Sequence, residues 1–317
     1  MFIITHRKFF FWLTGLILAA AVGAILFWGL PLGIDFTGGT MMQVNYPNGR
    51  PALDTVQKEI APISIGSVSL RVVGDTAIAL RSRTLSQAEH DAILTALSSN
   101  ASTTLNGAQS APSGESPKAT VTELSYTSVG PALGSQFTNK ALWAIFAVVL
   151  VIVLYVAFAF RKVSRPVPGW AYGLTVVAML AIDIIVPTGF YAAYAHFTGA
   201  EVDSLFVVAL LSLLGYCVND VIVIFDRVRE NLAKNSRTNS KEPFEETIGK
   251  SIAETMTRSI NTSLTVVLAL LALIYFGAES TRTFALVMLV GVAAGTFSSI
   301  ARSAPLLIPI AKWFEKK

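Results

Sequence analysis

The chain has 317 residues, of which 53% are apolar and only 14% are charged, and its mean hydropathy is +0.60. A soluble globular domain carries about a quarter charged residues, so this composition indicates a membrane protein. The net charge of +4 is dispersed, without a basic stripe of interleaved aromatics, and we expect no nucleic-acid partner. Cys217 is the single cysteine, which excludes an internal disulfide and any cysteine-based metal site.

The first apolar stretch is Phe9–Leu30, which follows the basic residues Arg7 and Lys8. About 20 residues in a helix cross the roughly 30 Å of hydrocarbon in a bilayer. A cleaved signal peptide is the alternative, but its apolar core would span only about 7–15 residues. We therefore expect a retained membrane helix at this end of the chain.

Five more stretches have the composition of membrane-spanning helices. They are Ala141–Phe160, Gly169–Tyr191, Leu205–Phe225, Arg258–Phe276 and Phe284–Ala304. Lysine and arginine gather before the first span, between the second and third, after the fourth and at the end of the chain. The positive-inside rule then predicts that both termini are cytoplasmic.

The expected organisation follows from these spans. Its parts are an N-terminus with the first helix (1–32), an extracytoplasmic domain (33–139), helices two to six with a cytoplasmic loop at about 226–257 (140–305), and a cytoplasmic C-terminal tail (306–317).

The polar block after the first span alternates strand and helix patterns. They predict a strand at Thr40–Tyr46, a helix at Ala52–Ile60, a hairpin of Val68–Val73 and Ala77–Arg81, a helix from Ser86 through Leu97, and a strand at Ala119–Tyr126. Ser86 and Glu89 have the spacing of a capping box. The order β-α-β-β-α-β predicts a small α+β ferredoxin-like domain. Ser98–Lys118, rich in small and polar residues, is expected to be a flexible loop within it.

The fourth span contains a carboxylate within an apolar run, LLGYCVNDVIVIFD at 213–226. An aspartate at the centre of a membrane helix costs about 2.5–3.5 kcal/mol on insertion scales, so Asp220 should face the bundle interior. Gly215, Tyr216 and Asn219 share its helix face at spacings of three and four, which predicts one polar, close-packing stripe. A purely structural role for Asp220 is the alternative.

The fifth span carries a matching polar stripe. Arg258, Asn261, Thr262 and Thr265 follow the spacing i, i+3, i+4 and i+7. Arg258 would lie at the cytoplasmic edge of the membrane, at a depth from which it can reach Asp220. The alternative is that Arg258 extends to the membrane surface and pairs with Glu254 one turn earlier.

Two other spans carry features of interest. Asp183 lies in the third span, nearer the outer face, where it could couple to Asp220 through water or a polar network. Gly291, Gly295 and Ser299 follow every fourth position of the sixth span, a small-residue face that predicts close helix contact. Arg302 adds a charge to the same span.

Four motifs resemble the SecF family, which belongs to the RND superfamily: GIDFTGGT at 33–40, GYCVNDVIVIFDRVREN at 215–231, RSINTSLT at 258–265 and GTFSSI at 295–300. The resemblance implies an RND-type half bundle of six helices in the bacterial cytoplasmic (inner) membrane. It implies a subunit that uses proton-motive force, together with SecD, to assist late protein translocation. The implied partners are SecD, the SecYEG translocon, exported unfolded polypeptides and membrane lipid.

The resemblance also implies residue roles. The family's functional aspartate and arginine fall on Asp220 and Arg258, and its third-helix acid falls on Asp183. The family often has histidine where Ile182 stands, so no histidine–aspartate relay is expected, and Arg302 is unusual for the family. The expected proton-coupling residues are Asp220, Arg258, Asp183, Asn219, Asn261 and Thr265, and the expected helix-packing residues are Gly215, Gly291, Gly295 and Ser299.

Gly33, Asp35, Gly38 and Gly39 lie where the first helix gives way to the first strand. The two adjacent glycines suit a tight turn. The glycine-rich stretch lacks the Lys-Ser/Thr pair of a phosphate-binding loop, and we expect neither cofactor nor metal.

Three other functions remain as alternatives. A half-subunit of an RND small-molecule exporter would need a larger extracytoplasmic domain for drug binding. An intramembrane aspartyl protease would need two carboxylates close enough to share a proton, and Asp183 and Asp220 differ in depth. A non-conducting scaffold of the Sec complex would leave the buried charges unexplained. We expect that the protein is not an enzyme.

Overall fold

The computed structural model describes the chain except residues 1, 48, 75, 104–120, 161–166, 241 and 316–317. The chain divides into two compact units, one of Leu32–Lys140 and one that joins Met1–Pro31 to Ala141–Lys317.

The unit of Leu32–Lys140 contains one four-stranded antiparallel sheet. Its elements are α3 (Ile34–Thr37), β1 (Gly39–Asn45), α4 (Leu53–Ile60), β2 (Ser69–Val73), β3 (Ala77–Ser82), α5 (Gln87–Thr103) and β4 (Thr122–Val129). The strand order is β2-β3-β1-β4, so β3 lies between the two strands that α4 connects. This is the ferredoxin-like arrangement predicted from the order of elements.

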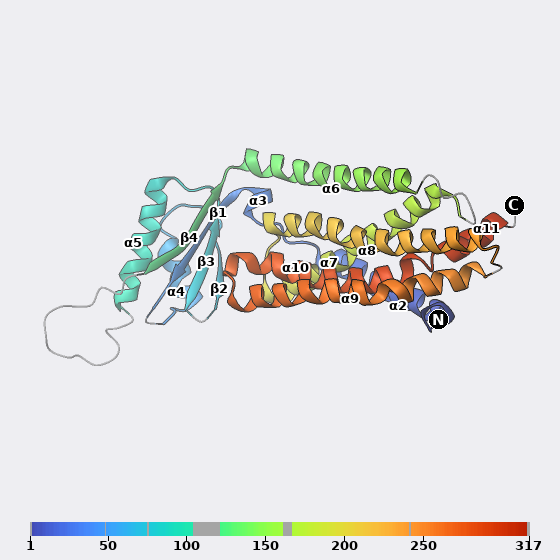
Figure 1. Cartoon of the computed structure of the whole chain (residues 1–317). Coiled ribbons are helices and arrows are strands. Elements are labelled where there is room, and N and C mark those ends of the chain that lie inside the picture. The colour runs from blue at the N-terminus through green and yellow to red at the C-terminus, as the bar shows by residue number, and fades with distance from the viewer. Residues whose placement is uncertain are drawn as a thin grey trace. The chain divides into compact units, whose positions relative to one another are not determined.

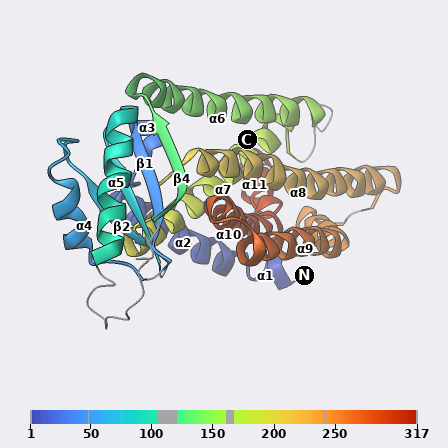
Figure 2. The same ribbon diagram turned by 90° about the vertical axis from the view of Figure 1, so that its left-hand side faces the viewer.

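Helices α4 and α5 cover one face of this sheet (Figures 1 and 2). Alternate strand residues such as Met42, Val44 and Leu80 point toward them and are almost completely buried, as are Ile60 and Ile93 of the two helices. Period-two strands and amphipathic helices therefore meet in a single apolar core.

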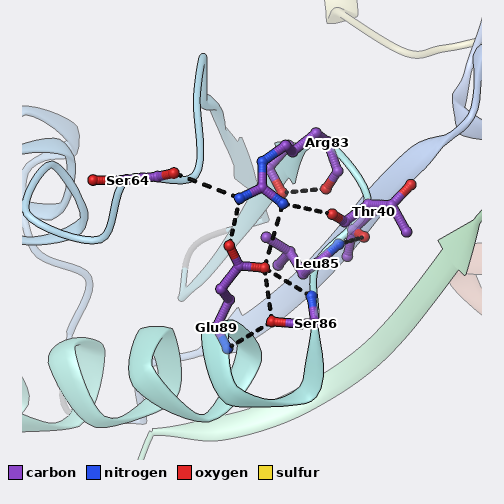
Figure 3. Close-up of polar contacts among 8 residues, drawn as sticks. Thr40, Ser64, Arg83, Leu85, Ser86 and Glu89 are labelled. Atoms are coloured by element: carbon purple, nitrogen blue, oxygen red, sulfur yellow. Dashed lines mark hydrogen bonds and ion pairs between the residues drawn. The ribbon is translucent and has the colours of Figure 1, made fainter.

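The predicted capping box at the start of α5 is confirmed (Figure 3). The Ser86 backbone N–H donates to Glu89 Oε2 at 2.8 Å, and the Glu89 N–H donates to Ser86 Oγ at 3.4 Å. Arg83 also pairs with Glu89, and its hydrogen bond, with those of Ser86, lowers the pKa of Glu89 to about 2. Helix α5 continues to Thr103, so the start of the loop expected at Ser98–Lys118 is helical; residues 104–118 lie outside the described residues.

The second unit is helical. Its elements are α1 (Phe2–Thr5), α2 (Arg7–Trp28), most of α6 (Pro131–Ala159), α7 (Gly169–Thr198), α8 (Ser204–Arg237), α9 (Phe244–Phe276), η2 (Glu279–Thr281), α10 (Arg282–Ser298), η3 (Ser299–Ser303) and α11 (Leu307–Glu315). Six segments of the described chain are helical, long and apolar enough to cross a membrane. The predicted fold class, six such helices with a small α+β domain between the first two, is confirmed.

Helices α7, α8, α9 and α10 run alongside one another, and α10 contacts the other three (Figure 1). The core of the unit gathers apolar residues of α7 and α8 around the aromatic side chains Phe160, Tyr172 and Phe225, whose rings pack together. By contrast, the apolar side chains of α2 and α6 are mostly exposed.

The expected loop at about 226–257 is largely helical, because only residues 238–243 separate α8 from α9. Both helices continue past their apolar spans as amphipathic segments, whose residues Val228, Ile248 and Ile252 join the core. The expected tail at 306–317 likewise contains a packed helix, α11, with Leu307 and Ile308 buried. The predicted spans did not include these extensions, because one face of each is polar and lowers the mean hydropathy of the segment.

Candidate functional site

Asp220 lies in the interior of the helical unit, midway along α8, with only 5% of its surface exposed. The hydroxyl groups of Ser259 on α9 and Ser299 on η3 lie beside its carboxylate. Its buried Oδ2 and the Ser259 Oγ have no hydrogen-bond partner among the described residues. Three elements therefore meet at a carboxylate whose hydrogen-bonding capacity is only partly used.

Ser259 was not predicted as a site residue, although the sequence contains a signal for it. Ser251, Thr255, Ser259 and Ser263 recur at every fourth position of α9, and all four are buried. Small hydroxyl residues at this spacing allow close helix approach and can donate hydrogen bonds across the interface. The buried face of α9 is therefore one residue away from the stripe that begins at Arg258.

The predicted stripe of Arg258, Asn261 and Thr265 is exposed, as is Asn219 on α8. Arg258 acts on Asp220 through its charge, but the two do not form a contact ion pair. The pairing of Arg258 with Glu254 is not formed either. Glu254 instead accepts from Arg227 at 2.6 Å and from Asn231 at 2.9 Å.

A hydroxyl chain connects three helices next to Asp220. The Tyr216 hydroxyl donates to Ser263 Oγ at 2.9 Å, and Ser263 Oγ lies 2.6 Å from Thr296 Oγ1. Tyr216 is on α8, Ser263 on α9 and Thr296 on α10, so these bonds hold the three helices together one turn from the carboxylate.

Asp183 forms a second buried carboxylate site, on α7, with 2% of its surface exposed. Cys217 on α8 and Ser298 on α10 face it, and the charge of Arg302 acts on it from η3. Arg302 is itself only 4% exposed. Asp183 Oδ1 and Arg302 Nε and Nη1 lack hydrogen-bond partners among the described residues.

The glycines of α10 allow it to approach α8 closely. A Cβ atom on Gly291 would lie 2.3 Å from Leu213 Cδ2, and one on Gly295 would lie 2.3 Å from Cys217 Sγ. Ser299, the third residue of this face, is 1% exposed. Gly215 does not belong with them, because it is exposed and its Cβ would meet nothing within 4 Å. The predicted packing of Gly215 therefore has no contact to support it within the described part of the chain, although Tyr216 and Asp220 of the same stripe lie toward α9.

The predicted junction residues surround the short helix α3. Gly33 is its N-cap and Asp35 lies in its first turn. Gly38 and Gly39 have φ angles of 74° and 128°, and a Cβ on either would approach backbone atoms to 2.7 Å. Both the conformation and the space therefore require glycine here. No group of three or more metal-ligating acids, histidines or cysteines occurs in the described part of the chain.

Comparisons with known proteins agree with this architecture. Residues 110–313 match the family described as protein export membrane protein SecD/SecF, C-terminal, and residues 23–46 match the SecD/SecF GG motif. A protein translocase subunit SecF from Thermobaculum terrenum is 34% identical over 96% of this chain and 92% of its own length. Another, from Synechocystis, is 31% identical over 90% of this chain and 84% of its own.

A solved structure is also similar. The crystal structure of SecDF, a translocon-associated membrane protein from Thermus thermophilus, matches 98% of this chain with a TM-score of 0.75 and 28% identity. The match covers 38% of the SecDF chain, so this chain spans less than half of that protein.

Six apolar helices with carboxylates buried between them define a multi-pass membrane protein. The chain belongs to the SecD/SecF family of protein export membrane proteins, and the relatives that it matches over nearly their full length are SecF subunits.

Proposed function

We propose that this chain is an accessory subunit of the Sec export machinery that uses proton-motive force, together with SecD, to assist late translocation. The observation that carries the proposal is Asp220, a 5% exposed carboxylate with an oxygen that has no hydrogen-bond partner among the described residues. An ionised carboxylate is costly to bury without full compensation, whereas a protonated one is not. A group in this environment can favour different helix arrangements in its two protonation states.

The proposed cycle uses the residues around Asp220. When the carboxylate is charged, it is stabilised by the hydroxyls of Ser259 and Ser299 and by the charge of Arg258. When the carboxylate is protonated, these groups stabilise it much less, and α8 can repack against α9 and η3. Proton access from opposite sides of the membrane in the two states would make the cycle directional.

The proposal places SecD against the exposed polar residues of α8 and α9. Asn219, Arg258, Asn261 and Thr265 lie within or near apolar membrane spans, where polar side chains are costly to expose to lipid. A second helical bundle would cover them. The similarity to SecDF, of which this chain matches 38%, supports SecD as that bundle.

The remaining parts of the proposal come from the family and the composition. We place the protein in the bacterial cytoplasmic membrane with both termini in the cytoplasm. SecYEG and unfolded polypeptides would be its partners in export, and no enzymatic step is assigned to it. A non-conducting scaffold of the Sec complex is the alternative that the following experiment separates.

Asp220→Asn keeps the size of the side chain but fixes it in a neutral state. Export into membrane vesicles that contain this chain and SecD should lose its uncoupler-sensitive component, while association with SecD and membrane levels stay unchanged. Asp226→Asn is the matched control, because Asp226 is an exposed carboxylate on the same helix, paired with Arg229. A variant Asp220→Asn that retained the full uncoupler-sensitive export would favour the scaffold.

A further inference from the structure

Arg302 is a buried cation that the proposed proton cycle does not use. Its side chain is 4% exposed, and its Nε and Nη1 have no hydrogen-bond partner among the described residues. An arginine guanidinium stays protonated in proteins, so this charge cannot be removed by loss of a proton. A buried unpaired charge is strongly destabilising, and Arg302 therefore needs a counter-charge nearby.

Asp183 is the charged group that acts on Arg302. It is 2% exposed, and its Oδ1 also lacks a hydrogen-bond partner among the described residues. The orphaned atoms, Asp183 Oδ1 and Arg302 Nε and Nη1, make no hydrogen bond to one another or to any other described residue. Two opposite buried charges that act on one another, both with unused hydrogen-bonding atoms, suit bridging by ordered water.

The backbone around Arg302 links the two acidic sites. Residues Ser299–Ser303 form a π-helix, a wide turn that often occurs at functional sites. Ser299 at its start lies beside Asp220, and the charge of Arg302, three residues later, acts on Asp183. The Ser303 hydroxyl donates back to the Ser299 carbonyl oxygen, across the turn. One five-residue element thus contributes a side chain to each carboxylate.

We propose that Arg302 is the fixed, water-bridged counter-charge of Asp183, and that this pair anchors η3 so that Ser299 is held against Asp220. Arg302 is then a positioning residue for the proton site. Asp183, matched to a cation that cannot titrate, stays ionised and does not carry the proton. The inference deepens the proposed function, since it leaves Asp220 as the carboxylate that exchanges protons.

The groups that face Asp183 and Asp220 bear on this assignment. Asp183 faces Cys217 of α8, Ser298 of α10 and Arg302 of η3. The hydroxyls of Ser259 on α9 and Ser299 on η3 lie beside Asp220, and the charge of Arg258 acts on it. Tyr216 and Cys217 are the titratable groups of its own helix that interact with it. Only Asp183 has a buried guanidinium among these neighbours, since Arg258 is exposed.

The experiment is a double-mutant cycle on the full-length chain expressed with SecD. Asp183→Asn and Arg302→Met each leave one buried charge without its partner, and each should lower membrane levels and thermal stability several-fold more than Lys312→Met. Lys312 is a control cation, exposed and paired with Glu245 at 2.7 Å. The double variant removes both charges, and its levels should recover to near wild type. The proposed charge pair is overturned if the membrane level of the double variant is no higher than that of the less abundant single variant.

Infrared spectroscopy separates a charge pair from mere packing. The spectrum of the wild type at neutral pH should contain no protonated-carboxyl band that depends on Asp183, and such a band should appear in Arg302→Met but not in Arg302→Lys. If Arg302→Met does not accumulate, the difference between the infrared spectra of the wild type and the double variant shows whether Asp183 is protonated in the wild type. An Asp183-dependent protonated-carboxyl band in the wild type overturns the proposal.

These readouts do not depend on proton-driven export. If Asp220→Asn retained uncoupler-sensitive export, the proposed function would fail while the Asp183–Arg302 result stood. Conversely, if the double-mutant cycle showed no coupling between Asp183 and Arg302, the charge-pair inference would fail while the Asp220→Asn result stood.

Discussion

At the residue scale, the relation between Arg258 and Asp220 is one of charge at a distance. Arg258 is exposed and makes no contact ion pair with Asp220, although its charge acts on it. The two-pronged hydrogen-bonding geometry of an arginine is therefore not used in this relation. Without a contact ion pair, we expect the sign of the charge at this position to matter more than the shape of the cation.

Arg258→Lys should accordingly retain most of the uncoupler-sensitive export, whereas Arg258→Gln should reduce it severalfold. The measurement is the vesicle export assay with and without an uncoupler. Arg227→Gln serves as control, because Arg227 pairs with Glu254 and Glu230 and does not act on Asp220. Equal losses in the lysine and glutamine variants would mean that the guanidinium makes a specific contact, for example with SecD.

Gly295 is a second residue whose role is decided by its immediate neighbours. A Cβ atom at this position would lie 2.3 Å from Cys217 Sγ, which is nearer than non-bonded atoms can approach. Overpacking of this kind costs about 1–3 kcal/mol. Because Cys217 and Asp183 are also close to one another, a displaced α10 would disturb the Asp183 site as well.

Gly295→Ala should therefore lower the thermal stability of the chain, and Cys217→Ala in the same chain should restore most of it by removing Sγ. Gly215→Ala is the matched control: this glycine lies on an exposed helix face with nothing within 4 Å of its Cβ. It should be neutral or stabilising by up to about 1 kcal/mol, since alanine favours a helix more than glycine does. No rescue by Cys217→Ala would show that Sγ is not the obstacle.

At the scale of elements, His90 connects α5 to β4 in a way that depends on pH. Its Nδ1 lies 3.0 Å from Asp91 Oδ1 and its Nε2 lies 3.2 Å from Glu123 Oε1, while the Tyr126 ring packs edge-on against it at 4.4 Å. Both ring nitrogens can donate only when the imidazole is protonated. Burial opposes that charge, but the carboxylates of Asp91 and Glu123 outweigh burial and raise the pKa of His90 above 6.5.

A group whose pKa is higher in the folded than in the unfolded protein stabilises the fold. This stabilisation is fully present below the unfolded pKa and is lost as the pH rises through the folded pKa. The thermal stability of the sheet unit should therefore fall between about pH 6 and pH 8, and His90→Gln should flatten this dependence. His196→Gln provides the control from the helical unit, because His196 is stacked on Trp28 instead. A dependence that persists in His90→Gln would exclude this histidine as its source.

At the scale of the whole molecule, the distribution of lysine and arginine predicts the orientation in the membrane. The two sites to compare are Gln57, exposed on α4 of the sheet unit, and Ser236, exposed near the end of α8. With Cys217 replaced by alanine, a membrane-impermeant thiol reagent should label Gln57→Cys from outside intact cells. Ser236→Cys should react only after the membrane is opened. Labelling of both from the same side would contradict the six-span topology with cytoplasmic termini.

The sequence by itself determined the parts of this protein that depend on local pattern. Apolar length predicted six membrane helices, alternation and turn residues predicted the order of the sheet unit, and the spacing of Ser86 and Glu89 predicted a capping box that the structure confirms. These features arise from interactions between residues near in sequence, or from the need of each backbone to satisfy its hydrogen bonds in lipid.

Tertiary structure decided which face of each helix is inside. Asn219 and the stripe from Arg258 to Thr265 were expected near Asp220 but are exposed, while Ser259, one residue along, lies beside it. One residue is about 100° of helix rotation, and polar residues on both faces of α9 left that rotation undetermined. Arg302 shows the same limit, because its place opposite Asp183 depends on a π-turn and on the approach of α7, α8 and α10, none of which a local pattern records.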